Sequence, residues 1–346
     1  MRGLTISAHG GFDQVTVRDD LPVPTLGAPT DVRVRIHAAA LNHLDLFVLA
    51  GLPGVTIVPP WIMGADGAGT VDAVGPAVSS VRPGDRVLIN PGISDRTCEY
   101  CRQGEQSLCV RYRLLGEHLP GTIADFVVVP AANVRKVAEG VSWDRAAALP
   151  LTSLTAWRML VTRAAVRAGE TVLIWGIGGG VSTAALQIAV MLGAQVWATS
   201  GSDAKLARAR ALGAARTFNH RTQDVGREVR ALTEKRGVDV VIDNVGAATW
   251  SQSLVALGKR GRLVTCGATS GPIVETDLRR LFWNQWTIMG STMGNDSELD
   301  AMLDAFTQGV ISPVIDASFP LEEGRAALER LASKEQFGKI VIRLAE

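Results

Sequence analysis

The spacing of apolar positions changes near the middle of the chain. Before about Val137, short alternating or β-branched runs such as 31–36 and 86–89 are separated by Gly and Pro, which is typical of half-buried β-strands. From about Ser153 onward, apolar runs alternate with Ala- and Leu-rich segments of helical length. That alternation predicts a parallel sheet with crossover helices. The fold class is therefore expected to be α/β, with a mainly β part preceding it.

The second part contains four strand-like runs and is followed by a third segment. The runs are 171–175, 195–199, 238–243 and 262–266, and the third segment offers an amphipathic helix at 298–309 and a final strand at 339–344. A chain of 346 residues exceeds the usual size of one hydrophobic core. Two closely joined domains are expected, since no repeat or low-complexity linker is evident.

Composition narrows the class of partner. The chain is 47% hydrophobic and 20% charged, which indicates packed globular domains. The 35 basic and 34 acidic side chains leave a net charge of +1, so nothing predicts binding to nucleic acid or to an anionic membrane. The N-terminal sequence lacks the pattern of a secretory signal, and no apolar run reaches membrane-spanning length. A cytoplasmic protein with a small-molecule substrate is expected.

A glycine-rich turn follows the run at 171–175. Gly176, Gly178, Gly179 and Gly180 stand between that run and a helix expected to begin near Val181. Strand, glycine turn, helix and second strand are the order of a Rossmann unit, in which the turn and the helix N-terminus hold a pyrophosphate. The alternative is a tight turn that binds nothing, but four glycines exceed what such a turn needs. The position of the last glycine of the usual motif is occupied here by serine, at residue 182.

The end of the second strand bears on the choice of dinucleotide. NAD-specific enzymes place an acidic residue there, whereas this chain has Thr-Ser-Gly-Ser at 199–202. Ser200, Ser202 and Lys205 can donate to a 2′-phosphate, which favours NADP(H) over NAD(H). Lys205 is equally compatible with a solvated helix position.

Three of the four cysteines lie close together in the first part. Asp95, Cys98, Cys101 and Cys109 supply one carboxylate and three thiolates, in the close spacing that wraps a tetrahedral Zn²⁺. A closed shell of four protein ligands predicts a structural ion rather than a catalytic one. Glu99 or a water molecule competes with Asp95 for the carboxylate place, and three free cysteines beside a surface aspartate are the alternative.

Several further motifs resemble those of one family over nearly the whole chain. They are AALNHLD at 39–45, GADGAGTVDAVG at 64–75, PGDRV at 83–87, GTIADFVVVP at 121–130, DNVG at 243–246 and FGKIVI at 337–342. Together with the glycine turn and the cysteine lobe, they resemble the medium-chain dehydrogenase/reductase superfamily, which contains zinc alcohol dehydrogenases and zinc-free quinone oxidoreductases.

The resemblance implies an architecture, an assembly and cofactor contacts. It implies a GroES-like catalytic domain at 1–152 with a zinc lobe at 90–112, a Rossmann domain at 153–290, a return to the catalytic domain at 291–346, and a homodimer or homotetramer. The cofactor contacts that it implies are Thr155, Gly179, Gly180, Val181, Ser200, Ser202, Lys205, Asn244, Gly267 and Lys339. Outside the glycine turn, each of these has an alternative as a turn or cap residue.

The same resemblance argues against a catalytic zinc. Asn42 stands at the first ligand position of the zinc enzymes, Ala65 replaces the histidine, and the third position, near Leu151, offers no cysteine. Asn42 and His43 are then the candidate hydrogen-bond donors to a substrate, although a structural bond of His43 to the backbone is an equal alternative.

Three functions remain open on the sequence. The first is NADPH-dependent reduction of a quinone or an activated double bond without catalytic zinc. The second is alcohol or aldehyde oxidoreduction, either metal-free or with a zinc ion recruited through His43 and Asp66. The third is a noncatalytic protein that binds NADPH. Phe47, Trp61 and Trp283 are variable positions expected to shape the substrate pocket.

Overall fold

The structure, a computed structural model, describes residues 1–344 and divides into two compact units. Unit 1 comprises Met1–Thr152, Asn295–Ser297 and the chain from Pro313 onward, and unit 2 comprises Ser153–Gly294 and Glu298–Ser312. The C-terminal segment expected at 291–346 ends in two residues, 345–346, that lie outside the described part. Each unit is described by itself.

Unit 1 is mainly β. Its strands are β1 Gly3–Ile6, β2 Val15–Arg18, β3 Asp31–Ala40, β4 Trp61–Ile62, β5 Asp66–Val74, β6 Arg86–Ile89, β7 Gly92–Ile93, β8 Arg113–Leu114, β9 Phe126–Pro130, β10 Val134–Lys136, β17 Ile315–Pro320 and β18 Lys339–Arg343. Its helices are α1 His43–Ala50, α2 Glu99–Arg102, α3 Trp143–Ala148 and α11 Gly324–Ala332, with short turns η1 Phe12–Gln14, η2 Gln106–Leu108, η3 Ala131–Asn133 and η5 Leu321–Glu323.

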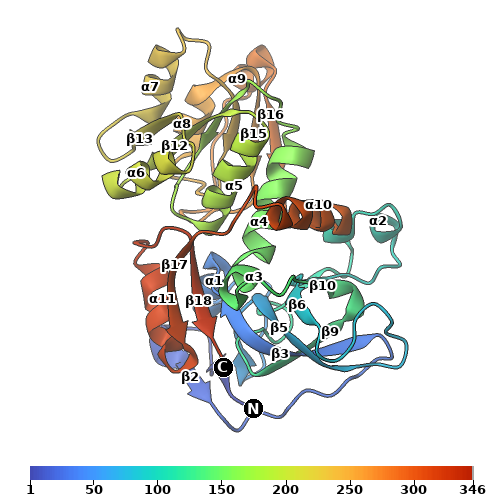
Figure 1. Cartoon of the computed structure of the whole chain (residues 1–346). Coiled ribbons are helices and arrows are strands. Elements are labelled where there is room, and N and C mark those ends of the chain that lie inside the picture. The colour runs from blue at the N-terminus through green and yellow to red at the C-terminus, as the bar shows by residue number, and fades with distance from the viewer. Residues whose placement is uncertain (345–346) are drawn as a thin grey trace. The chain divides into compact units, whose positions relative to one another are not determined.

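The main sheet of unit 1 joins the two ends of the chain. Its strand order is β10-β6-β5-β3-β18-β17, and β9 also pairs with β3. Alternate residues of β3, such as Val32 and Val34, are fully buried and belong to the core of the unit, as the period of two in the sequence predicts. Strand β18 pairs antiparallel with β3, Val341 opposite Ala40, so the last strand lies beside one of the first (Figure 1). This pairing carries Lys339 to the end of β3.

Unit 2 is an α/β domain. Its strands are β11 Thr171–Ile174, β12 Gln195–Ser200, β13 Arg216–Asn219, β14 Val238–Ile242, β15 Leu257–Thr265 and β16 Thr287–Gly290, and its helices are α5 Gly180–Met191, α6 Asp203–Ala211, α7 Val225–Leu232, α8 Trp250–Ala256 and α9 Leu278–Asn284, with the π-helical segment η4 Arg158–Arg163. Two further helices, α4 Pro150–Trp157 and α10 Asp296–Thr307, each contain residues of both units.

The sheet of unit 2 is parallel throughout, with the order β13-β12-β11-β14-β15-β16. Strands such as β11 and β14 are buried almost entirely, as expected for a sheet with helical crossovers. The strand order reverses between β11 and β14, and in doubly wound folds ligands bind at the carboxyl ends of the strands beside such a reversal. The predicted fold class is confirmed.

The sequence prediction named four of the six strands described in unit 2 and missed β13 and β16. The run at 262–266 is the end of a longer strand, β15, which begins at Leu257 and is interrupted where Arg260 adopts a positive φ of 59°. Helix α10 begins and ends two residues earlier than expected, at Asp296 and Thr307. None of the described helices is long and apolar enough to cross a bilayer.

Candidate functional site

The glycine turn follows β11 and leads into α5. Gly176 and Gly178 have φ of 66° and 125°, values that favour glycine because a side chain would be strained there. The Gly176 N–H donates to Thr199 Oγ1 at 3.2 Å, which ties the turn to β12. Ser182, at the position of the last glycine of the usual motif, is 1% exposed and its hydroxyl donates to Trp175 O at 2.9 Å. A small residue therefore lets α5 pack closely against β11.

Two other glycines have no conformational reason to be glycine. Gly179, the N-cap of α5, has a φ of −73°, and an added Cβ would meet no atom closer than 3.8 Å. Gly267, just past β15, has an ordinary φ and would place a Cβ 3.6 Å from Asn244 O. Both glycines, where a Cβ would fit without a clash, lie at the carboxyl ends of strands, where a bound dinucleotide would approach the backbone. The residues present therefore fit a dinucleotide.

The predicted cofactor contacts are distributed over both units. Thr155, in α4, is 5% exposed and its hydroxyl contacts Met293 Sδ at 3.6 Å. The other contacts in unit 2 follow the ends of β11, β12, β14 and β15: Gly179, Gly180, Val181, Ser200, Ser202, Lys205, Asn244 and Gly267. Ser202 caps α6 by accepting from Lys205 N at 3.5 Å. These contacts stay predictions.

A basic pair beside the end of β12 was missed in the sequence. An added Cβ on Gly201 would lie 2.7 Å from Arg221 Nε and 3.1 Å from His220 Nε2, so both side chains cover Gly201. The guanidinium of Arg221 has no hydrogen bond or ion pair with another described residue. Partial burial and the charge of Arg221 lower the pKa of His220. Because parallel strands end at one edge, the residues that follow β13 could have been expected beside those that follow β12.

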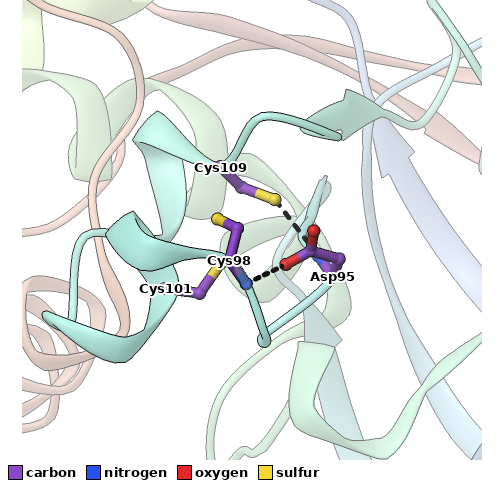
Figure 2. A group of neighbouring side chains, drawn as sticks. All are labelled: Asp95, Cys98, Cys101 and Cys109. Carbon is purple, nitrogen blue, oxygen red and sulfur yellow. Dashed lines mark hydrogen bonds between the residues drawn. The ribbon is translucent and has the colours of Figure 1, made fainter.

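The cysteine lobe brings together the four predicted metal ligands. The ligand atoms of Asp95, Cys98, Cys101 and Cys109 all lie within 4.8 Å of one another, and their side chains face a common centre (Figure 2). Within the described chain, this is the one such group of three or more His, Cys, Asp or Glu residues, and Glu99 is not part of it. Three sulfurs and one oxygen at this spacing fit a tetrahedral Zn²⁺.

Backbone N–H groups orient the Asp95 carboxylate of this lobe and keep it ionised. Asp95 Oδ1 accepts from Thr97 N and Cys98 N, each at 2.9 Å. These bonds hold the pKa of Asp95 well below its usual range, so the group is ionised and its other oxygen is available to a cation. Cys109 Sγ similarly accepts from Asp95 N and Arg111 N, both at 3.3 Å.

A second polar cluster is buried in unit 1. Lys339 Nζ donates to Asn42 Oδ1 at 2.5 Å and to Asp66 Oδ2 at 2.9 Å. Asp66 Oδ1 accepts from Leu151 N at 2.8 Å, so one carboxylate ties the ends of β3 and β18 to α4. Lys339 and Asp66 are 3% and 0% exposed. Asn42 and Leu151, which the family resemblance places at or near two ligand positions of the zinc enzymes, thus both donate to Asp66, whose ionic partner is the Lys339 ammonium.

The two predicted catalytic residues, Asn42 and His43, differ in whether their hydrogen-bond donors already have acceptors. Asn42 Nδ2 donates to Asp66 Oδ2 at 2.9 Å and to Ala40 O at 3.3 Å, so its amide hydrogens already have acceptors, which favours a positioning role. His43 begins α1, packs edge-on against Phe47 with ring centroids 4.8 Å apart, and makes no hydrogen bond with another described side chain or backbone group. Burial, together with the charge of Lys334, lowers the pKa of His43. His43 is then neutral near pH 7 and keeps one ring N–H to donate.

Asp45 holds the loop that carries these residues. Its carboxylate accepts from Asn42 N at 2.7 Å and from Gly64 N at 3.1 Å. Burial raises the pKa of Asp45 to about 6. Among the expected pocket residues, Trp61 is 7% exposed and its Nε1 donates to Gly116 O at 3.0 Å, so its ring belongs to the core, while Trp283 is 75% exposed on α9.

Comparison with known proteins agrees with this arrangement. Residues 28–139 match the alcohol dehydrogenase GroES-like domain, and residues 180–308 match the zinc-binding dehydrogenase domain. The chain belongs to the medium-chain dehydrogenase/reductase superfamily. The predicted resemblance is confirmed, and the protein is an oxidoreductase.

The relatives divide among several activities within this superfamily. A solved structure described as an NAD-dependent alcohol dehydrogenase superposes with a TM-score of 0.95 at 45% identity and covers 99% of both chains. A quinone oxidoreductase from Pseudomonas aeruginosa is 32% identical over 98% of both chains. An acryloyl-coenzyme A reductase from Metallosphaera sedula is 31% identical over 99% of both chains.

Proposed function

We propose that this oxidoreductase uses NADPH to reduce a quinone or an activated alkene or carbonyl compound, without a catalytic zinc. The observation that carries the proposal is the buried cluster of Asn42, Asp66 and Lys339. A zinc alcohol dehydrogenase needs three ligand side chains and an open coordination position, whereas here Asn42 is bonded to Lys339, and Ala65 and Leu151 offer no donor side chain.

The chain's own residues then have to stabilise the charge that develops on the substrate. When bound, NADPH supplies the hydride. A quinone or a conjugated carbonyl compound has an electrophilic carbon, so what it requires is orientation and hydrogen-bond donors to the forming oxyanion. His43, which is neutral near pH 7 and makes no hydrogen bond with another described residue, is the proposed donor, and Asn42 holds its neighbours in place. The quinone oxidoreductase and the acryloyl-coenzyme A reductase among the relatives support this substrate class.

The preference for NADPH is supported by the groups that surround the end of β12. No acidic residue stands at 199–202, while Arg221 and His220 lie against Gly201. The guanidinium of Arg221, which has no hydrogen bond or ion pair with another described residue, is well suited to a 2′-phosphate. The relative described as NAD-dependent supports the opposite choice, and a comparison of kcat/KM for NADPH and NADH decides between them.

Structural zinc and self-association complete the proposal. Asp95, Cys98, Cys101 and Cys109 are proposed to hold one Zn²⁺ that stabilises their lobe. The protein is proposed to form a homodimer or homotetramer. Helix α9 has no buried residue, and it precedes the edge strand β16, so we propose that a second copy of this chain packs against it.

Steady-state assays test the proposed reaction. Purified protein is given NADPH with 1,4-benzoquinone or a 2-alkenal, and in parallel NAD⁺ or NADP⁺ with simple alcohols. Turnover of the quinone or alkenal, retained after treatment with a zinc chelator, is expected. Turnover confined to alcohols would replace the proposal with the alcohol dehydrogenase alternative, which the NAD-dependent relative favours. Tight NADPH binding without turnover of any of these compounds would favour a noncatalytic protein.

A further inference from the structure

Asp243 is a buried carboxyl group that the proposed mechanism does not use. It follows β14 and is 0% exposed. Its Oδ1 accepts from Val245 N at 2.9 Å and from Gly246 N at 3.1 Å, and its Oδ2 accepts from Thr249 Oγ1 at 2.8 Å and from Ser253 Oγ at 2.7 Å. All four partners are donors, which is the environment of an ionised carboxylate. No cation among the described residues pairs with it.

The location of Asp243 is the ligand-binding edge of the sheet. It comes directly after the strand beside which the strand order reverses, so it lies at the crevice where doubly wound folds bind their ligands. Trp175 N donates to Ile242 O at 3.1 Å, which places the turn at 244–246 next to the glycine turn. The first half of such a sheet holds one mononucleotide and the second half holds the other. Since the glycine turn and β12 serve the adenosine half, Asp243 belongs to the nicotinamide half.

The carboxylate organises two loops of that half. It fixes the turn at 244–246 through the backbone N–H groups of Val245 and Gly246. The turn at 244–246 also accepts a hydrogen bond from the next loop, since Ser270 N donates to Val245 O at 2.8 Å. Gly267, where a Cβ would make only an ordinary contact with Asn244 O, lies at the start of the same loop. A change at Asp243 therefore reaches both loops that border the subsite.

The charge of Asp243 is also felt at the end of β15. Burial, and after it the negative charge of Asp243, raises the pKa of Cys266 to about 12. Cys266 precedes Gly267, so the negative potential extends to the residue next to Gly267. A negative potential in a partly dry site stabilises a positive charge placed there.

We propose that Asp243 is a positioning residue that holds the nicotinamide subsite and biases it electrostatically toward the oxidised cofactor. This inference rests on the proposed function. In the reaction the C–H bond at the reduced ring breaks, both electrons pass with the hydride to the electrophilic carbon of the substrate, and a proton from a donor neutralises the substrate oxygen. A nicotinamide ring held here would gain one positive charge in this step, and the fixed carboxylate of Asp243 would favour that charge without reorganisation.

Equilibrium binding of the two cofactor forms tests the inference. Kd for NADPH is measured from its fluorescence and Kd for NADP⁺ by competition, in wild type and in Asp243→Asn. Asparagine keeps the shape and one acceptor oxygen and removes the charge. The ratio of Kd for NADP⁺ to Kd for NADPH is expected to rise about tenfold, which corresponds to roughly 1.4 kcal/mol. A folded variant in which both constants change by the same factor would overturn the electrostatic role.

Two further variants keep the inference testable if Asp243→Asn does not fold. Ser253→Ala removes one hydroxyl donor and leaves the carboxylate less neutralised, so the same ratio is expected to fall below the wild-type value, and an unchanged or higher ratio would count against the inference. Thr233→Val removes a hydroxyl that donates to Val229 O at the end of α7 and accepts from Gly237 N, and its ratio should equal that of wild type. A wild-type protein that binds neither cofactor form would instead refute the proposed function.

Discussion

Lys339 and Asp66 form a buried ion pair, 2.9 Å apart, between residues separated by 273 positions in the sequence. The side chains of the pair are 4% and 0% exposed. Such a pair adds little net stability relative to apolar residues, because both charges lose their hydration. Removing one partner is costly, because the other is left charged in the interior.

Lys339→Met is therefore expected to lower the free energy of unfolding by roughly 3–5 kcal/mol, measured by urea denaturation. Arg343→Met is the matched control on the same strand, because Arg343 pairs with Asp144 through a side chain that is 63% exposed. The control should cost at most about 1 kcal/mol. Equal losses in the two variants would show that Asp66 is solvated in solution.

The raised pKa of Asp45 is expected to make the stability of the fold depend on pH. The carboxyl ionises near 3.8 in the unfolded chain, whereas burial raises its pKa to about 6 in the folded chain. Between about pH 4 and pH 6 the folded state binds more protons, so this group lowers the free energy of unfolding as pH rises, by about 3 kcal/mol in total. Above pH 6 its contribution is constant.

Denaturation of wild type and Asp45→Asn at several pH values checks this expectation. The difference in unfolding free energy between the two proteins should change across pH 4 to 6 and stay level above pH 6. A difference that is constant over the whole range would mean that Asp45 ionises normally when folded.

Asp95 is expected to control how tightly the cysteine lobe holds zinc. Asp95→Ala removes one ligand and should speed the loss of zinc to a chelator, whereas Asp95→Cys completes a four-thiolate set and should slow it. Glu99→Ala is the control, since Glu99 is outside the group, and its rate should match that of wild type. Zinc release is followed with a chromophoric chelator. Protein purified without chelator that contains far less than one zinc per chain would refute the site.

The glycine turn and the cysteine lobe could be predicted from the sequence because their residues are close in sequence. Gly176 to Ser182 and Asp95 to Cys109 form local loops whose geometry follows from spacing and backbone preference. The ion pair of Lys339 with Asp66 could not be predicted from spacing, because it depends on the antiparallel pairing of β18 with β3. Arg221 was missed for a similar reason: its closeness to Gly201 follows from the order of β12 and β13 in the sheet.

The exposed apolar side chains of helix α9 are expected to form the contact between copies of the chain. Leu278 and Phe282 are each 67% exposed and lie one turn apart, and Trp283 is 75% exposed. Apolar side chains so exposed on one helix favour burial against another surface. Trp283→Glu combined with Phe282→Glu is expected to reduce the mass of the particle measured by light scattering. Leu232→Glu, an exposed apolar position on α7, should leave the mass unchanged. A monomeric wild-type protein would refute the expectation.

Arg221 is expected to set the preference between NADPH and NADH. Arg221→Ala removes the guanidinium that lies against Gly201, and should raise KM for NADPH by about tenfold to a hundredfold, the loss typical of a charged hydrogen bond worth roughly 1.5–3 kcal/mol. KM for NADH, which has no 2′-phosphate, should change by less than about twofold. Arg227→Ala is the control, because that side chain is 86% exposed and pairs with Asp224. Equal effects of Arg221→Ala on both cofactors would place the guanidinium away from the 2′-phosphate, and would leave the absence of an acid at 199–202 as the remaining support for NADPH.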